Sequence, residues 1–198
     1  MNRNEFFGLV SGDLTAAELK RLQVAYWFAK DVHRGQERDS GERYFEHVRR
    51  ATVNLIERGV RNVECLITGL VHDVAEDTNA PDGVIHDLFG PIVHRDVMLL
   101  SKSVPSFDTV TGKIVARAKK DIAEYYAAIE REGINAPLAK FADRMDNLST
   151  CFNFAPERKA RYIHETETYI LPMAQRIDPW FVGKLTDLLN KVKAAQAA

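Results

Sequence analysis

Cysteine is scarce in this sequence, and the marks of a secreted or membrane protein are missing. The chain has two cysteines, Cys65 and Cys151, which are too few for a disulfide framework and do not form a CxxC pair. No apolar run approaches the roughly 20 residues that cross a bilayer. The start of the chain, Met1–Glu5, lacks the basic and then apolar order of a signal peptide. We therefore expect a cytoplasmic protein without a membrane partner, whose two thiols are buried and reduced.

An excess of charge of either sign is also absent. The 198 residues carry 27 Lys and Arg against 28 Asp and Glu, which gives a formal net charge of −1. Binding a nucleic-acid duplex relies on many uncompensated cations, so we expect no nucleic-acid partner. With 45% hydrophobic residues, 11 glycines and 7 prolines, the chain is neither disordered nor collagen-like. Nothing in the composition indicates an oligomeric state.

Apolar residues recur at helical spacing along most of the chain. The first clear case follows the capping box Thr15-Ala-Ala-Glu18 and reaches about His33. Further helices are predicted over about 44–58, 63–74, 84–89, 91–102, 113–132, 137–152, from 156 with a kink or split at Pro172, and from 179 onward. Residues 103–112 read as a loop, and no segment is a convincing strand. The sequence predicts an all-α fold, a single domain of about eight to ten helices over residues 1–198.

Four polar side chains end the otherwise apolar helix predicted over 63–74. They are His72, Asp73, Glu76 and Asp77, and residues four apart share a helix face. Grouping three carboxylates is unfavourable unless a cation or a proton compensates their charge. A solvated helix end explains the same pattern, so the spacing alone leaves a site and a surface feature equally open.

Two other segments add candidate ligands. His47 lies on the helix predicted over 44–58, and Asp143, Asp146 and Asn147 share one face of the helix predicted over 137–152. Each segment alone reads as an ordinary histidine or a polar surface stripe. Together with the cluster at 72–77, they offer two imidazoles and two carboxylates to one cation. Such mixed nitrogen and oxygen ligation suits Mn²⁺, Fe²⁺ or Zn²⁺ better than Ca²⁺.

In their order along the chain, these segments resemble a known family. The sequence is similar to the HD superfamily of metal-dependent phosphohydrolases, and within it to the alarmone hydrolase domain of the Rel/SpoT type, especially the stand-alone small alarmone hydrolases. The matching segments are Arg38–His47, His72–Thr78 and Lys140–Asn147, and the resemblance covers about 25–177. A bare His-Asp pair is a weak signal, whereas His-Asp-x-x-Glu-Asp-Thr with both flanking segments is a strong one. The resemblance implies a helical bundle of the HD type.

The resemblance also implies roles for individual residues. By position, the metal would be held by His47, His72, Asp73 and Asp143, and Mn²⁺ is the expected ion, with another divalent transition metal as the alternative. The acidic pair Glu76 and Asp77 matches residues that activate and position the attacking water.

Four further positions match nucleotide contacts of the family. Arg38 corresponds to the residue that stacks on the purine and Ser40 to a neighbour of the base, while Asn147 and Thr150 match nucleotide-contacting positions. One departure falls among them, because the usual Arg-Leu-His-Asn reads here Arg-Met-Asp-Asn, with Asp146 in place of histidine. Asp146 adds negative charge beside the metal or the nucleotide.

The implied activity is metal-dependent hydrolysis of the 3′-pyrophosphate of guanosine 3′,5′-bis(diphosphate), ppGpp, and related alarmones of the stringent response, which gives GDP or GTP and pyrophosphate. The alternatives are an HD phosphohydrolase for a ppApp-type alarmone, NADPH or a nucleoside monophosphate, and a non-catalytic nucleotide-sensing domain. The last predicts a broken ligand set, whereas all four metal positions are intact here. The basic segment 102–120 reads as electrostatic guidance for an anionic substrate or as a solvated face.

Overall fold

Helices make up most of the computed structural model, which describes residues 1–81 and 83–197. Asp82 and Ala198 of the expected domain lie outside the described residues. The elements in chain order are α1 (Arg3–Gly8), α2 (Ala16–Val32), α3 (Tyr44–Glu57), α4 (Val63–Val71), α5 (Val74–Asp77), α6 (Val84–Phe89), α7 (Pro91–Leu100), β1 (Ser103–Phe107), β2 (Ile114–Lys119), α8 (Ile122–Arg131), α9 (Asn135–Thr150), the 3₁₀ turn η1 (Cys151–Asn153), α10 (Pro156–Glu165), the π-helical turn η2 (Thr166–Ile170), α11 (Leu171–Ile177) and α12 (Pro179–Ala197). The expected all-α class is confirmed.

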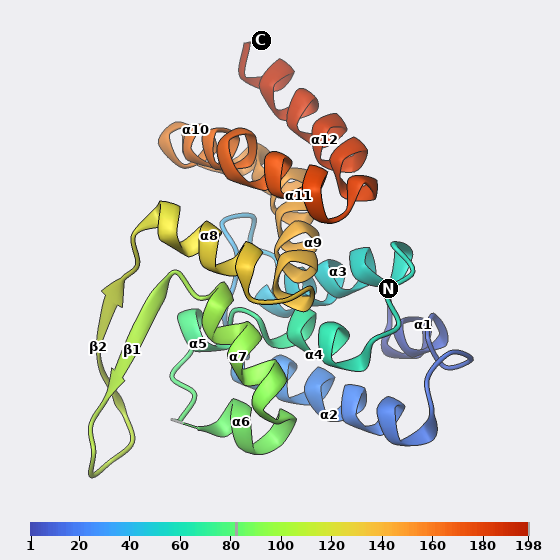
Figure 1. Cartoon of the computed structure of the whole chain (residues 1–198), viewed down its shortest axis with the longest axis vertical. Helices are drawn as coiled ribbons and strands as arrows, with labels where there is room; N and C mark the ends of the chain where they lie inside the picture. The colour runs from blue at the N-terminus through green and yellow to red at the C-terminus, as the bar shows by residue number, and fades with distance from the viewer. Residues whose placement is uncertain (82, 198) are drawn as a thin grey trace.

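Helix α9 is the central helix of the fold. It stands at the centre of the molecule in Figure 1, with α3 and α4 on one side and α10 to α12 above it. Every residue of α9 from Asn135 to Leu148 is buried, although several of them are charged. Helices α3, α4, α7 and α12 all contact it. Because charged side chains are costly to bury alone, the polar residues of α9 must find partners inside the bundle.

The hydrophobic core extends from the first helix to the last. One continuous cluster of buried apolar side chains runs from Phe6 in α1 to Val192 in α12. The predicted capping box at the start of α2 is formed, because the Thr15 hydroxyl accepts a hydrogen bond from the backbone N–H of Glu18 at 3.3 Å. Helix α4 is buried on nearly all faces, as its apolar sequence predicts.

Helices α3 and α4 pack unusually close together. A Cβ atom at Gly69 in α4 would lie 2.8 Å from Cδ1 of Leu55 and 3.0 Å from Oγ1 of Thr52, both in α3. Glycine is therefore the residue that allows this approach. This close approach matters for the site, because α3 carries His47 and His72 directly follows α4. The two imidazole centroids are 5.5 Å apart.

The helix predicted over 63–74 is divided in two. Helix α4 stops at Val71, and α5 begins at Val74 and lasts only four residues. Asp73 lies between them with φ −93° and ψ −4°, which is the sparsely populated bridge region in which many active-site residues lie. The predicted division at Pro172 is also present, because the π-helical turn η2 separates α10 from α11 just before this proline.

One prediction of secondary structure is wrong. Residues 103–119 form an antiparallel hairpin, where the sequence predicted a loop and the start of a helix. Its register pairs Ser103 with Lys119 and Phe107 with Ile114, with an irregularity after Ser106. The turn is held by the carboxylate of Asp108, which accepts the backbone N–H of Thr111 at 2.7 Å.

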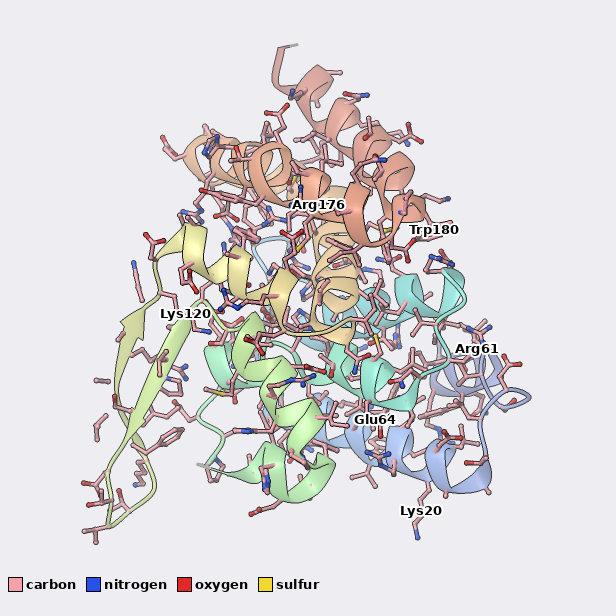
Figure 2. The ribbon with its side chains drawn as sticks, viewed as in Figure 1. Lys20, Arg61, Glu64, Lys120, Arg176 and Trp180 are labelled. Carbon is pink, nitrogen blue, oxygen red and sulfur yellow. The ribbon has the colours of Figure 1, made fainter. Side chains whose placement is uncertain are left out.

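The hairpin extends away from the helical body and returns to it at Lys120 (Figures 1 and 2). There the Lys120 ammonium donates to the carbonyl of Met98 in α7 at 2.6 Å. Arg117 of β2 donates to the carbonyls of Ala75 and Thr78, the second at 2.7 Å. The hairpin is thus fastened to α5, the short helix that carries the acidic pair. Within the described residues, no helix is both long enough and apolar enough to span a membrane.

Candidate active site

Four side chains from three parts of the chain converge on one point, as the sequence predicted. Nε2 of His47 in α3 lies 3.3 Å from Oδ2 of Asp73 and 3.3 Å from Oδ1 of Asp143 in α9. Nε2 of His72 lies 3.2 Å from the same Asp73 oxygen and 3.6 Å from the same Asp143 oxygen. Two nitrogens and two oxygens therefore surround a common centre, with both histidines and Asp143 buried.

The tautomers of the two histidines leave both Nε2 atoms free to bind a metal. Nδ1 of His72 is 2.8 Å from the carbonyl oxygen of Gly69, which can only accept, so Nδ1 carries the proton. Nδ1 of His47 likewise donates to Oδ2 of Asp146 at 2.6 Å. Nε2 of His72 is buried and has no hydrogen-bond partner among the described residues. A bare imidazole nitrogen, held from behind by the other ring nitrogen, is the usual arrangement of a metal-binding histidine.

The electrostatics of this cluster demand a cation. Burial tends to raise the pKa of Asp143, but Lys140 and the two histidines outweigh it and hold the pKa well below the usual range. Burial tends to lower the pKa of His47, yet Asp143, Asp146 and Asp73 around the ring raise it to about 10, so that without an ion a proton takes the place of the metal at Nε2. The pKa of His72 is also raised to about 10, because the nearby Asp73 and Asp143 outweigh burial. Either protons on the histidines or a divalent ion can compensate the negative charge of the carboxylates. The mixed nitrogen and oxygen donors fit a divalent ion.

Asp77 lies next to the metal donors through Tyr44. The Tyr44 hydroxyl is 2.8 Å from Oδ2 of Asp73 and 2.5 Å from Oδ2 of Asp77. The tyrosine ring stacks on His33 with centroids 4.8 Å apart, which fixes its orientation. Burial, and next the charge of Asp73, raises the pKa of Asp77 to about 6. A carboxyl group with a pKa near neutrality is suited to exchange a proton with a reacting water.

Glu76 points in a different direction from the donors. Its Oε2 accepts the backbone N–H of Lys102 at 2.8 Å, at the base of the hairpin. The division of α4 from α5 explains this, because Glu76 no longer shares a continuous helix face with His72. Glu76 still lines the same cavity as the donors, so the carboxylate is available to a ligand without being a donor itself.

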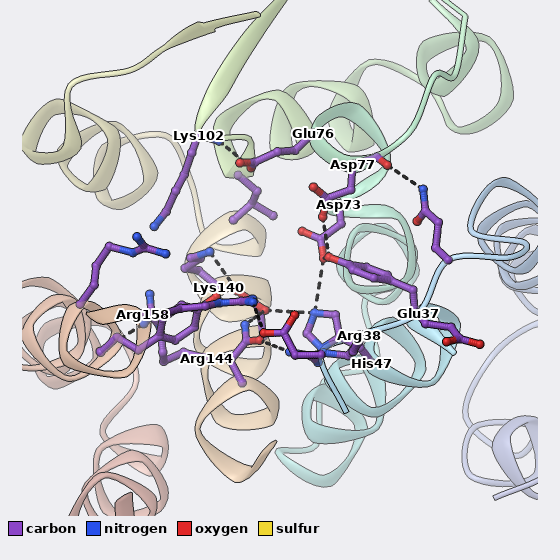
Figure 3. A pocket seen from close by; sticks show the side chains of 18 residues that line it. Glu37, Arg38, His47, Asp73, Glu76, Asp77, Lys102, Lys140, Arg144 and Arg158 are labelled. Atoms are coloured by element: carbon purple, nitrogen blue, oxygen red, sulfur yellow. Dashed lines mark hydrogen bonds and ion pairs between the residues drawn. The ribbon is translucent and has the colours of Figure 1, made fainter. Parts of the chain in front are cut away.

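A cavity of about 530 Å³ opens over the donors. Figure 3 shows Asp73, Glu76 and Asp77 along one side of it and Lys102, Lys140, Arg144 and Arg158 along the other. The residues that line it are Gln36, Glu37, Arg38, Asp39, Tyr44, His47, Asp73, Glu76, Asp77, Leu100, Lys102, Lys140, Asp143, Arg144, Asn147, Arg158, Arg161 and Tyr162. An acidic wall faces a basic wall, which suits a ligand that carries several anionic groups next to a metal ion.

Buried ion pairs hold the basic wall in place. Lys140 donates to Oδ2 of Asp143 at 2.9 Å. Arg144 and Lys102 both donate to Oε2 of Glu165 in α10, each at 2.8 Å. Burial tends to raise the pKa of Glu165, but Arg144 and then Lys102 outweigh it and lower the pKa to about 2. Three cations therefore meet two carboxylates here, and the surplus positive charge faces the cavity.

The predicted nucleotide contacts divide into two groups. Arg38 and Asn147 line the cavity, and NH2 of Arg38 donates to Oδ1 of Asn147 at 2.6 Å. Ser40 is exposed, and the Thr150 hydroxyl donates to the backbone carbonyl of Asp146 at 3.0 Å. Neither Ser40 nor Thr150 is among the described residues that line the cavity. Their nucleotide contacts stay predictions.

The sequence pointed to the donors but did not single out the basic wall. Lys140 lies one helical turn before Asp143, and this i, i+3 spacing is the signal that could have identified it. Lys102 opens the basic segment 102–120, whose charge the sequence offered as guidance for an anionic substrate, whereas Arg158 has no signal of either kind. They come from a loop and from α10, and only the folded chain brings them to the cavity.

The family model for the HD domain matches residues 25–180. The chain belongs to the HD domain family. The matched range includes His47, His72, Asp73 and Asp143 and the acidic pair. This membership also implies a divalent metal, which the donor set fits.

Relatives of this HD domain include much longer proteins. The chain is 31% identical to the bifunctional (p)ppGpp synthase/hydrolase SpoT of Escherichia coli K12 over 169 residues, which is 85% of this chain and 23% of that protein. It is 32% identical to the guanosine-3′,5′-bis(diphosphate) 3′-pyrophosphohydrolase of Aquifex aeolicus over 166 residues, 82% of this chain and 22% of the relative. The chain thus spans less than a quarter of the length of either protein.

A solved structure shares the fold. It is described as a metazoan ortholog of SpoT that hydrolyzes ppGpp and plays a role in starvation responses. The TM-score is 0.70 at 21% sequence identity, and the match covers 90% of this chain and 96% of the other. The two chains therefore share the helical arrangement over most of their length.

Proposed function

We propose that this HD domain hydrolyses the 3′-pyrophosphate of guanosine 3′,5′-bis(diphosphate) and related alarmones in the cytoplasm, with Mn²⁺ as its metal. The observation that carries the proposal is the cavity itself, in which two imidazoles and two carboxylates lie between an acidic and a basic wall. The names of the relatives, which are ppGpp synthases or hydrolases, support this choice of substrate.

Hydrolysis has to overcome the repulsion between water and an anionic phosphate. His47, His72, Asp73 and Asp143 would hold the divalent ion, which supplies Lewis acidity by neutralising phosphate charge and lowering the pKa of water. In the reaction, a water oxygen bonds to the phosphorus next to the ribose, and the bond from that phosphorus to the 3′ oxygen breaks. One water proton ends on the 3′ oxygen, and pyrophosphate leaves with the remaining hydroxyl group.

The acidic wall handles the proton in this scheme. Asp77, with its pKa of about 6, is largely ionised at neutral pH and can accept a proton from the attacking water. Glu76, which the Lys102 backbone N–H holds in place, can orient the same water. Tyr44 keeps Asp77 close to Asp73, so that the proton acceptor and the metal donors stay next to each other.

The basic wall binds the pyrophosphate group. Lys102 and Arg144 are already paired with Glu165, and Arg158 is paired with Asp39, so each is held in place at the cavity. The pyrophosphate oxygens gain negative charge as the bond to the 3′ oxygen breaks and the water oxygen adds, and fixed cations stabilise that charge. A substrate with only one phosphate group would use this wall less well than an alarmone with two pyrophosphates.

The test is product analysis with purified protein. The purified protein is incubated separately with ppGpp, ppApp, NADPH and a nucleoside monophosphate. Each reaction is run with Mn²⁺ and again after exhaustive chelation of the metal. We expect GDP and pyrophosphate from ppGpp, about one metal ion per chain, and no turnover without metal. Faster turnover of ppApp, NADPH or the monophosphate would assign the chain to another HD phosphohydrolase. Binding of nucleotides without any product would indicate a sensing domain, and an unchanged rate after chelation would overturn the proposed metal role.

A further inference from the structure

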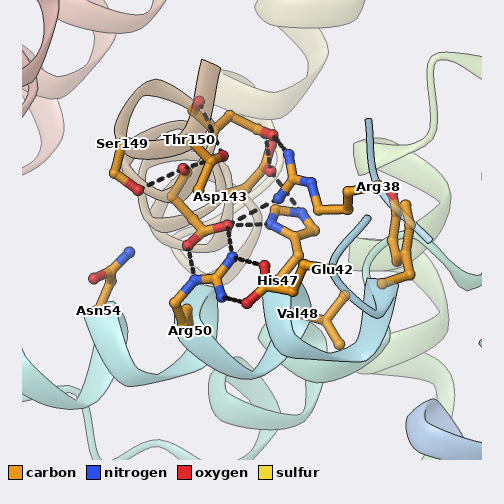
Figure 4. Close-up of polar contacts among 12 residues, drawn as sticks. Arg38, Glu42, His47, Val48, Arg50, Asn54, Asp143, Ser149 and Thr150 are labelled. Carbon is orange, nitrogen blue, oxygen red and sulfur yellow. Dashed lines mark hydrogen bonds and ion pairs between the residues drawn. The ribbon is translucent and has the colours of Figure 1, made fainter. Parts of the chain in front are cut away.

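One buried carboxylate on α9 joins the metal side of the cavity to its nucleotide side. Asp146 is 3% exposed and accepts hydrogen bonds from three side chains, two on α3 and one in the loop before it. Nδ1 of His47 is 2.6 Å from Oδ2, NH1 of Arg38 is 3.0 Å from the same oxygen, and Nε of Arg50 is 2.5 Å from Oδ1. Figure 4 shows Arg38, His47 and Arg50 directed towards the same part of α9.

The charge of Asp146 is paired inside the protein, and the Arg50–Glu42 pair beside it is partly exposed. Glu42 accepts NH1 and NH2 of Arg50 at 2.5 and 2.8 Å, so two carboxylates face two guanidinium groups. An unpaired carboxylate in such a buried place would be strongly destabilising. The pairing therefore keeps Asp146 ionised, and an ionised carboxylate is a stronger hydrogen-bond acceptor than a neutral group.

On the metal side, Asp146 fixes the ring of His47. The carbonyl of Gly69 does the same for His72, but Asp146 does it with a full negative charge. A carboxylate behind a ligating histidine fixes its tautomer and makes its free nitrogen more basic. Nε2 of His47 then faces Asp73 and Asp143, where the ion would sit.

On the nucleotide side, Asp146 fixes Arg38. This arginine lies in the loop between α2 and α3 and is not itself part of a helix. Its side chain is nevertheless only 7% exposed, because the guanidinium group is held by Asp146 and Asn147. The guanidinium plane at the cavity is therefore set by Asp146 as well as by Asn147.

We propose that Asp146 is a positioning residue that orients the metal donor His47 and the nucleotide contact Arg38 with one carboxylate. The nucleotide half of this inference rests on the proposed function, whereas the metal half does not. Loss of the charge of Asp146 should therefore weaken two kinds of binding at once, although the residue contacts neither the ion nor the nucleotide.

The test compares Asp146→Asn with wild type in two separate measurements. Mn²⁺ affinity, measured by calorimetry without nucleotide, should fall about 10- to 100-fold, as losses behind a metal-binding histidine do. KM for ppGpp, measured at saturating Mn²⁺, should rise about fivefold or more, because stacking contacts of this kind are worth on the order of 1–3 kcal/mol. The matched control is Glu42→Gln, which removes a charge from the same cluster although the Glu42 side chain is hydrogen-bonded to Arg50 and not to His47 or Arg38. The backbone carbonyl of Glu42, which accepts the N–H of Arg38 at 2.8 Å, is unchanged by the substitution. It should leave both values within about twofold.

The outcomes separate the inference from the proposed function. Wild-type Mn²⁺ affinity and wild-type KM in folded Asp146→Asn would overturn the inference, even if the melting temperature falls. Weaker Mn²⁺ binding in a protein that hydrolyses no nucleotide would support the metal half and refute the proposed substrate. If Asp146→Asn does not melt cooperatively, Asp146→Glu decides, because its longer side chain keeps the charge but cannot keep all three contacts. Unchanged Mn²⁺ affinity and KM in that variant would also overturn the inference.

Discussion

His72 shows most clearly how a single residue can indicate a metal site. Its Nδ1 proton is used by Gly69, and its Nε2 atom is buried beside two carboxylates without a hydrogen bond among the described residues. A buried polar atom without a partner is costly, and the position of this one beside two carboxylates is that of an atom that binds a ligand. The neighbouring Glu76 differs, because a backbone N–H already satisfies one of its oxygens.

Two substitutions separate the metal donors from the acidic pair. Asp73→Ala removes a donor atom and should abolish both metal content and turnover. Glu76→Gln should keep about one metal ion per chain and lower kcat by about 100-fold, because the amide orients the attacking water less well and misplaced reacting groups cost on that order. Metal analysis and steady-state kinetics on the same samples check this. Loss of metal in both variants would contradict the separation and make Glu76 part of the metal site.

The donors were predictable from the sequence, whereas their surroundings were not. His72 and Asp73 stand out because polar residues interrupt an apolar helix, and the order of the three segments matches a family. The contact of Asp146 with Arg38 spans 108 residues, and no local pattern announces it. The resemblance assigned Arg38 a contact with the purine but no partner within the chain. Instead, Arg38 is held by α9.

At the level of elements, the hairpin is where local pattern and final structure disagree. Residues 114–119 have the sequence Ile-Val-Ala-Arg-Ala-Lys, in which apolar and basic residues are equally compatible with a helix face and with a strand. The deciding features are the turn that Asp108 holds and the positive φ of Gly112, +65°. Both terminate a helix and favour a reversal of the chain.

The hairpin should control the rigidity of α5. Arg117→Ala removes the donors to the carbonyls of Ala75 and Thr78 at either end of the acidic pair. We expect faster amide exchange over 74–78 and a several-fold lower kcat, with metal content unchanged. Hydrogen exchange followed by mass spectrometry measures the first effect. Lys113→Ala is the control, since Lys113 is exposed near the hairpin turn; an equal effect there would point to general loosening of the hairpin.

Glu165 ties α10 to α9 and to the base of the hairpin, and this tie should depend on pH. Its pKa is about 2 in the folded chain against 4.5 as the ordinary value, so its ionised form favours the folded state. The stabilisation is complete above pH 4.5 and disappears as the pH falls towards 2. A shift of this size corresponds to about 3 kcal/mol.

Glu165→Gln should therefore lower the free energy of unfolding by about 3 kcal/mol at pH 7. The difference from wild type should shrink between pH 4.5 and 2. Urea denaturation at several pH values measures it. Glu167→Gln removes the exposed pair with Lys193 and should change stability by less than about 1 kcal/mol. Equal losses of unfolding free energy in the two variants would show that the buried ion pairs of Glu165 stabilise the fold no more than an exposed pair does.

For the whole molecule, the metal site joins parts of the chain that are far apart in sequence. The donors come from α3, from the end of α4 and from α9, and these helices share one hydrophobic core. An ion bound to all three should stabilise the folded chain as one unit. At 100 times its dissociation constant, the gain is about 2.7 kcal/mol.

Adding Mn²⁺ to the apoprotein should accordingly raise the melting temperature by roughly 5–10 °C, in a single transition over residues 1–198. Scanning calorimetry with and without the ion measures this. His47→Ala should show no such rise, because it lacks one donor. Two separate transitions, of which only one responds to Mn²⁺, would show that the chain is not a single cooperative domain.

The close contact of α3 and α4 at Gly69 gives the site a second point of control, away from its donors. The separation of His47 and His72 follows from how near their helices come, and that distance depends on the space that Gly69 leaves for Leu55. Leu55 is fully buried and has little room to yield. The size of the ion that the site accepts therefore depends on the spacing of α3 and α4 behind the donors. A methyl group added at Gly69 would push the two helices apart, and a methyl group removed from Leu55 would let them close again, so the second change would suppress the first. Such pairs would change the metal preference without altering a single ligand.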